Sequence, residues 1–242
     1  MFWRKQKAAI AGFPPLHQAL IHERGFTATQ PADAWTALAA SLGRHNELVR
    51  RSKWALPPRT LDVLVPLILE VCSDVGRTGM LTVTADLRGP EALGKTSPSR
   101  NLAVRPPVRS AVETWTIDPW LRLHAELRDG SVLDILVVDR ARTRRVTKRN
   151  PRGKTKVKRK IKQVQIIKVR RRLPKDGTSA RPAGPPPRWI TVQVREGRRR
   201  SVLAAAKIDR LPRSAEEQLD RILTVTTEPF RWTPQTTAGG AR

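Results

Sequence analysis

The sequence predicts an α+β protein with N-terminal helices packed on an antiparallel β-sheet, a long protruding basic β-hairpin and a C-terminal helix. Apolar residues first recur at helical spacing, over residues 31–75. From residue 79 the apolar period changes to two, as expected for strands with one buried face. A helical pattern returns after residue 213, and Ser214 with Glu217 resembles a capping box that would begin this helix. These changes predict a helical part at 1–78, a sheet with a basic ribbon (139–172) at 79–172, a flexible proline-rich linker at 173–188, and a β-hairpin with the C-terminal helix at 189–242.

The N-terminal part is expected to contain three helices. The first covers residues 14–24 and ends at Gly25. The second covers residues 31–54, with a break at Gly43. The third, at 60–75, has apolar residues around its whole circumference and is expected to be buried. His17 and His22 lie five apart, which does not place them on one helical face, so both are expected to be partly exposed.

Alternating apolar residues predict strands at 81–87, 112–117 and 121–127, with a loop at 88–107. Asp129-Gly130 is a typical hairpin turn. The strand after this turn, 132–138, is apolar on both faces and is expected to lie in the centre of the sheet. It runs on past Asp139 into the basic ribbon, so we expect the ribbon to be anchored in the core at its base.

The basic ribbon is the most unusual feature of the chain. Residues 140–172 contain 17 Lys or Arg among 33 positions and no Asp or Glu, in a chain with a net charge of +26. Residues 150–153, Asn-Pro-Arg-Gly, fit a type I turn between two extended arms. Lysines at every second position from 154 to 162 are expected to lie on one face of the returning strand. Such a row of like charges predicts a polyanionic partner.

The candidate nucleic-acid-binding residues are the cationic side chains of this ribbon and its tip proline. They are Arg144, Arg145, Lys148, Arg149, Pro151, Arg152, Lys154, Lys156, Lys158, Lys160 and Lys162. A disordered charge run is the other interpretation of such a stretch. Seven interleaved Val and Ile residues between positions 146 and 169 favour an ordered ribbon.

The tip sequence Arg149-Asn150-Pro151-Arg152-Gly153-Lys154 resembles the arm tip of bacterial histone-like proteins of the HU and integration host factor family. The resemblance covers only the turn and is one residue short between Pro and Gly. In that family the tip proline wedges between base steps in the minor groove. The resemblance would assign this role to Pro151, with neighbouring cations on the phosphate backbone.

A second motif lies at residues 89–96, whose sequence GPEALGKT fits the phosphate-loop pattern of nucleotide-binding proteins. In that interpretation backbone amides near Gly94 would cradle phosphates, Lys95 would neutralise them and Thr96 would hold magnesium. A long helix should follow directly, but prolines at 98, 106 and 107 leave little room for one. We therefore expect a surface loop here, with an NTPase as the weaker alternative.

No other set of catalytic residues is recognisable in the sequence. Cys72 is the one cysteine, which rules out an intramolecular disulfide and a zinc site built on several cysteines. The four histidines lack the spacing of metal ligands. We expect no enzyme activity, no cofactor and no metal. No stretch is long and apolar enough to span a membrane, so a cytoplasmic protein is expected.

The main functional prediction is binding to the phosphate backbone of duplex DNA or structured RNA. No aromatic residue occurs between Trp120 and Trp189, so the ribbon itself has no ring for stacking unpaired bases. The alternative is an assembly protein whose basic arm docks onto an acidic protein partner or a neighbouring subunit.

Overall fold

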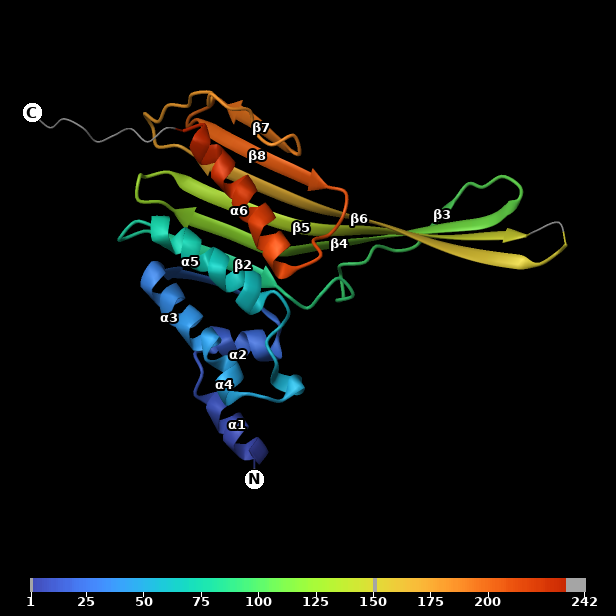
Figure 1. Cartoon of the computed structure of the whole chain (residues 1–242), viewed down its shortest axis with the longest axis horizontal. Helices are drawn as coiled ribbons and strands as arrows, with labels where there is room; N and C mark the ends of the chain where they lie inside the picture. Colours follow the sequence, from blue (N-terminus) through green and yellow to red (C-terminus); the bar gives the residue numbers. More distant parts are fainter. Residues whose placement is uncertain (1, 150–151, 234–242) are drawn as a thin grey trace, which may run out of the picture.

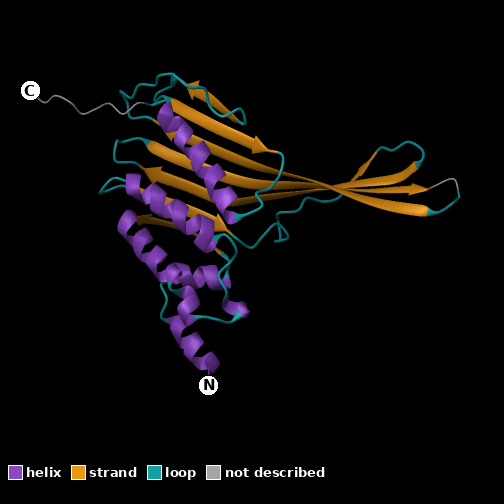
Figure 2. Cartoon of the chain, viewed as in Figure 1, coloured by secondary structure: helices purple, strands orange, loops and turns teal. Residues whose placement is uncertain are grey.

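The computed structural model describes residues 2–149 and 152–233 of the chain. The predicted α+β class is confirmed: a large antiparallel sheet is covered by helices on one face, and the C-terminal helix crosses that face (Figures 1 and 2). Part of the sheet extends well beyond the helices, so the molecule consists of a body and a protruding arm (Figure 1).

The described part of the sheet has eight strands in the order β1-β2-β4-β5-β6-β8-β7, with β3 paired to the outer part of β4. The strands are β1 (Gly25–Pro31), β2 (Met80–Asp86), β3 (Arg100–Leu102), β4 (Val108–Glu126), β5 (Val132–Arg149), β6 (Thr155–Arg172), β7 (Ile190–Arg195) and β8 (Ser201–Ile208). All pairings are antiparallel. β5 lies in the middle, as its apolar residues on both faces predict.

The helices are mostly those that the sequence predicts. They are α1 (Phe2–Ala11), α2 (Pro15–His22), α3 (Ala32–Gly43), α4 (His45–Leu48), the 3-10 turn η1 (Ser52–Trp54), the π-helical turn η2 (Thr60–Leu64), α5 (Val65–Asp74) and α6 (Ala215–Arg231). The break after Gly43 is confirmed, because α3 ends there. Within residues 2–149 and 152–233, no helix combines the length and the apolar character needed to cross a membrane.

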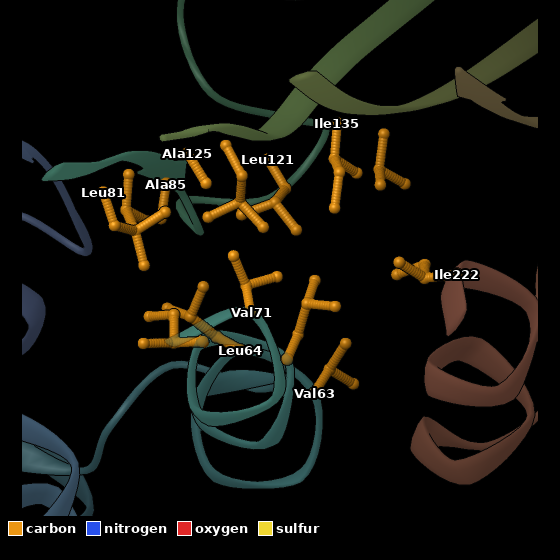
Figure 3. Close-up of a cluster of buried hydrophobic side chains, with 14 of the residues drawn as sticks. Val63, Leu64, Val71, Leu81, Ala85, Leu121, Ala125, Ile135 and Ile222 are labelled. Carbon is orange, nitrogen blue, oxygen red and sulfur yellow. The ribbon is translucent and has the colours of Figure 1, made fainter. Parts of the chain in front are cut away.

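The core lies between the body of the sheet and the helices η2, α5 and α6. Figure 3 shows side chains of the sheet, of η2 and α5, and of α6 meeting there. Val63, Leu64 and Val71 come from η2 and α5, Leu81, Ala85, Leu121, Ala125 and Ile135 from the sheet, and Ile222 from α6. Two tryptophans, Trp35 and Trp120, are fully buried. The indole N–H of Trp35 donates to the carbonyl of Leu81 at 2.9 Å, which ties α3 to β2.

The C-terminal helix begins as its sequence predicts. The Ser214 hydroxyl accepts a hydrogen bond from the Glu217 backbone N–H at 3.1 Å. The Glu217 carboxylate accepts from the backbone N–H of Arg213 at 2.7 Å, which satisfies a second free donor at this end. The segment before β7, residues 173–189, forms no helix or strand; its predicted flexibility stays a prediction.

A buried arginine, Arg171, connects three elements at the end of the body that lies away from the arm. Arg171 in β6 is 5% exposed and donates to the Ser131 hydroxyl at 3.1 Å. It also pairs with Asp129 in the β4–β5 turn, and its guanidinium lies 4.1 Å from the ring centre of Phe230 in α6. This side chain therefore holds a hairpin turn, a central strand and the C-terminal helix together.

Three features of the sheet were not predicted: strand β1, the continuity of β4, and strand β3, which lies within the loop expected at 88–107. β1 is an edge strand that pairs with β2 from Gly25↔Asp86 to Pro31↔Met80, although its sequence lacks a strong apolar alternation. The strands expected at 112–117 and 121–127 are one long strand, β4, with an irregularity between Asp118 and Leu121. An extra residue at this point accommodates Pro119, which has no N–H for the ladder.

The arm consists of residues 108–117 of β4, 140–149 of β5 and 155–164 of β6, with β3 at its side. β5 and β6 stay paired from Val132↔Arg172 in the body to Arg149↔Thr155 at the end of the arm. β4 pairs with β5 as far as Val108↔Lys148. The sequence predicted two extended arms here; the third strand was not anticipated. The turn residues Asn150 and Pro151 lie outside the described residues.

Candidate nucleic-acid interface

Strand pairing determines which side chains share a face of the arm. Val137 and Asp139 of β5 are buried under the helices in the body. Because side chains alternate along a strand, Arg140, Arg142 and Arg144 point to the other face, which no helix covers (Figure 2). Residues directly opposite one another on paired strands share a face, so the register extends this assignment to β4 and β6.

We call the uncovered side of the arm the basic face. It carries Arg140, Arg142, Arg144 and Lys148 from β5 and Lys156, Lys158, Lys160 and Lys162 from β6. Along β6 the lysines are spaced by about 6.6 Å. The alternation predicted from the sequence places these four lysines on one face of a strand, and the structure has them there. Lys154 precedes β6 and is not part of that strand.

The remaining predicted residues lie elsewhere. Arg145 and Arg149 of β5, together with the cross-strand Arg159 of β6, occupy the opposite face of the arm. Arg152 is exposed in the turn, and the Arg149 guanidinium donates to the carbonyl of Gly153 at 3.1 Å. Pro151, the residue that the resemblance would assign to a minor groove, lies outside the described residues. The predicted set is thus divided between two faces.

The basic face carries far more positive than negative charge. Like charges stand directly opposite one another at Arg142↔Lys162, Arg144↔Lys160 and Lys148↔Lys156. Glu113 of β4 is the carboxylate beside them: Arg144 donates to it at 3.0 Å, and this hydrogen bond lowers the pKa of Glu113. Directly opposed like charges destabilise a sheet. The face is therefore suited to an anionic partner that would relieve the repulsion.

β4 also brings an aromatic ring to the basic face. Trp115 is paired with Arg142 across the strands and is half-buried. The guanidinium carbons of Arg140 and Arg142 lie 5.3 and 5.7 Å from the centre of its ring. The ribbon strands β5 and β6 have no ring of their own, as predicted, but β4 places Trp115 beside them, which was not predicted. The strand-forming residues between Val112 and Ile117 were the signal that β4 continues into the arm.

The uncovered face of the body continues the basic face. A groove of about 600 Å³ lies there, with Leu136, Leu203 and Ala205 among its apolar lining. Cationic side chains also line it: Arg122, Lys168, Arg170 and Arg195. His124 and Asp134 form a hydrogen-bonded pair at 2.7 Å in the same groove.

The phosphate-loop motif forms a different kind of structure. Lys95 is 7% exposed, and its ammonium pairs with Asp118 at 2.6 Å and with Asp86 at 3.1 Å. Gly94 has a positive φ of 85°, and Thr96 forms an isolated bridge to Thr116 of β4. No helix follows the motif before β4 begins. Lys95 thus holds the 88–107 loop against the sheet, and its charge is already neutralised by carboxylates.

A second ion pair lies beside the first, at the base of the arm. Asp139 stands opposite Asp118 in the β4–β5 register and is 6% exposed. Burial raises the pKa of Asp139, although Arg59 donates to it at 2.8 Å and Gln165 at 3.2 Å. The Arg59 guanidinium also lies 4.7 Å from the ring centre of Trp120. Buried charges therefore mark the point where the apolar core ends and the arm begins.

The expectation that His17 is exposed was wrong. Its side chain is fully buried; its Nδ1 lies 2.9 Å from the Ser41 hydroxyl and its Nε2 lies 3.0 Å from Nδ1 of His45. The ring stacks on Phe13 at 3.9 Å between centres. α2 and α3 pack together through this polar contact. Among the described residues, no three His, Cys, Asp or Glu side chains are grouped as a metal site requires.

This histidine pair predicts acid sensitivity. Burial, together with the nearby His45, lowers the pKa of His17 from 6.5 to about 4. The unfolded chain therefore binds a proton at pH values where the folded chain does not, so the free energy of unfolding falls as the pH drops from 6.5 to 4. We expect His17 to account for a loss of about 3 kcal/mol at pH 4.

Urea unfolding of the wild type and of His17→Gln at pH 7 and pH 4 measures this loss. The variant should be less stable at pH 7 and should lose less stability on acidification. Equal losses in the two proteins would contradict the assignment, because other groups would then cause the whole effect.

Comparison with known proteins identifies no relative. The chain matches no protein-family model, and neither the curated proteins nor the solved structures contain a significant match.

Proposed function

We propose that this chain is a nucleic-acid-binding protein whose basic face grips the phosphate backbone of duplex DNA or structured RNA. One observation carries the proposal: eight cationic side chains share the uncovered face of the arm, and among the described residues two acids pair with them, Glu113 and the exposed Asp209. In this proposal the protein acts by binding and catalyses no reaction. Backbone contacts of this kind give affinity without reading the base sequence.

The dimensions of the arm suit this role. Ten residues of β5 reach about 33 Å, close to the 34 Å of one turn of duplex DNA. The pairing of three strands stiffens this length, and β5 and β6 are continuous with the core. A stiff, charged arm loses little conformational entropy on binding.

Salt dependence tests the proposal. If eight cations each neutralise one phosphate, raising the salt concentration from 50 to 200 mM should lower the affinity for a random 30-base-pair duplex by about 10⁴-fold. Fluorescence anisotropy with a labelled duplex and a labelled structured RNA measures the slope. If neither nucleic acid binds at 50 mM salt, the proposal is wrong.

The second candidate is an assembly protein whose basic arm docks onto an acidic partner or a neighbouring subunit. The groove on the body favours it, since Leu136 and Leu203 give that face an apolar lining of the kind that protein interfaces bury. Weak dependence of nucleic-acid affinity on salt, together with concentration-dependent self-association, would support this candidate over the first.

A further inference from the structure

We infer that a pocket at the base of the arm binds an unpaired nucleotide of the nucleic acid held on the basic face. This inference rests on the proposed function and goes beyond it, since it predicts a preference for duplexes with a single-stranded end. The pocket has a volume of about 250 Å³ and is lined by Trp115, Arg140, Arg142, Lys162, Val164 and Lys207. Four strands contribute to it: β4, β5, β6 and β8.

The pocket has an excess of positive charge. Among the described residues, neither Arg140 nor Lys207 forms an ion pair, and the buried Nε of Arg140 has no hydrogen-bond partner. Arg142 lies 3.7 Å from Glu113, and Lys162 lies 3.5 Å from the exposed Asp209. These two contacts are long, and the Lys162 pair is solvated, so they contribute little. A phosphate would supply the missing negative charge.

The lining of the pocket also includes an aromatic side chain, Trp115. The Trp115 indole N–H donates to Glu113 at 3.1 Å, which fixes the orientation of the ring. The guanidinium groups of Arg140 and Arg142 lie near this ring. A nucleic-acid base has a planar face that stacks on indole and guanidinium groups alike. The ligand that satisfies both the ring and the cations has a planar part and an anionic part, as a nucleotide does.

The location of the pocket selects an unpaired nucleotide. A base inside a duplex is already stacked and paired, and it reaches a pocket only after that stacking is lost. A single-stranded overhang has no such cost. The pocket lies where the arm joins the body, so a duplex that lies along the arm and ends beside Trp115 would bring its overhang to the pocket.

Binding of two labelled DNAs tests this inference: a blunt 30-base-pair duplex and the same duplex with a five-nucleotide overhang. Since stacking of one base contributes about 1–3 kcal/mol, the wild type should bind the overhang duplex about 5- to 150-fold more tightly. Trp115→Leu should abolish this preference, because it should weaken binding of the overhang duplex far more than binding of the blunt duplex. Trp115→Phe, which keeps a ring, should retain part of it. Trp3→Leu is the control, because Trp3 likewise lies beneath an arginine, Arg4, but is exposed and belongs to α1.

Each result has a distinct meaning. Equal binding of the two duplexes by the wild type overturns the inference and leaves the proposed function intact. An equal loss for both duplexes in Trp115→Leu also overturns it, because the tryptophan would then support the arm as a whole. If neither duplex binds, the proposed function fails and the inference with it. Displacement of the overhang duplex by an equal concentration of a free nucleoside monophosphate would show that the pocket serves a free nucleotide, which contradicts the inference.

Discussion

Replacement of Lys156, Lys158 and Lys160 by glutamine is expected to weaken binding of a 30-base-pair duplex by about 500-fold at 0.1 M salt. The logarithm of the affinity falls linearly with the logarithm of the salt concentration, and each phosphate contact adds about 0.9 to this slope. At 0.1 M salt one contact therefore changes the affinity by about eightfold relative to 1 M salt. The three side chains share the basic face and are exposed, so their loss should not disturb the core. The slope of log affinity against log salt should fall by about 2.7.

The opposite face of the arm provides the matched control. Arg145, Arg149 and Arg159 also carry three positive charges on β5 and β6, but they point away from the basic face. Their replacement by glutamine should change affinity by less than about tenfold, through the long-range field alone. Anisotropy titrations of both variants compare the faces directly. Equal losses would mean that the duplex contacts both faces, as when the arm inserts into a groove.

The second large effect concerns stability. Replacement of Lys95 by methionine is expected to lower the free energy of unfolding by about 3–5 kcal/mol, because it leaves a buried carboxylate without its cation. Asp118 is 2% exposed and lies opposite Asp139. Without the Lys95 ammonium, the repulsion between these two carboxylates would be less well balanced. Urea unfolding followed by circular dichroism measures the change.

Two further variants make this result specific. Lys95→Met combined with Asp118→Asn should recover at least half of the lost stability, since the unpaired charge is gone. Lys175→Met, at an exposed lysine, should change stability by less than about 0.5 kcal/mol. The phosphate-loop alternative predicts instead that the wild type binds ATP with magnesium and that Lys95→Met binds it more weakly. Absence of ATP binding in both proteins would exclude that alternative.

Much of the fold was predictable because local patterns and tertiary packing agree. The alternation around Leu121 and Leu123 predicted which face of β4 is buried. Asp129-Gly130 predicted the turn after this strand, and Ser214 predicted where α6 begins. The alternation of lysines along β6 likewise predicted which side chains share a face. In each case the residues that determine the element lie within the element itself.

The remaining features depend on contacts between distant residues. β1 is a strand because β2 offers it a free edge, and its own alternation of threonines is weak. His17 is buried because α3 supplies Ser41 and His45 follows in α4. Trp115 enters the candidate site because β4 pairs with β5 across a large separation in sequence. The pairing of β1 and the burial of His17 leave no signal in a short window of sequence, and the position of Trp115 follows only when β4 is extended past Asp118.

Because the pairing of β5 and β6 is continuous, residues of β6 in the body determine which face the lysines of the arm occupy. Ile167 and Val169 are buried in the body, and their insertion into the core sets the phase of alternation for the whole of β6. Loss of one residue between Lys162 and Ile167 would leave that insertion intact and rotate every side chain beyond it to the other face. The protein would stay folded and keep its net charge, but four ammonium groups would exchange places with Thr155, Val157, Arg159 and Ile161.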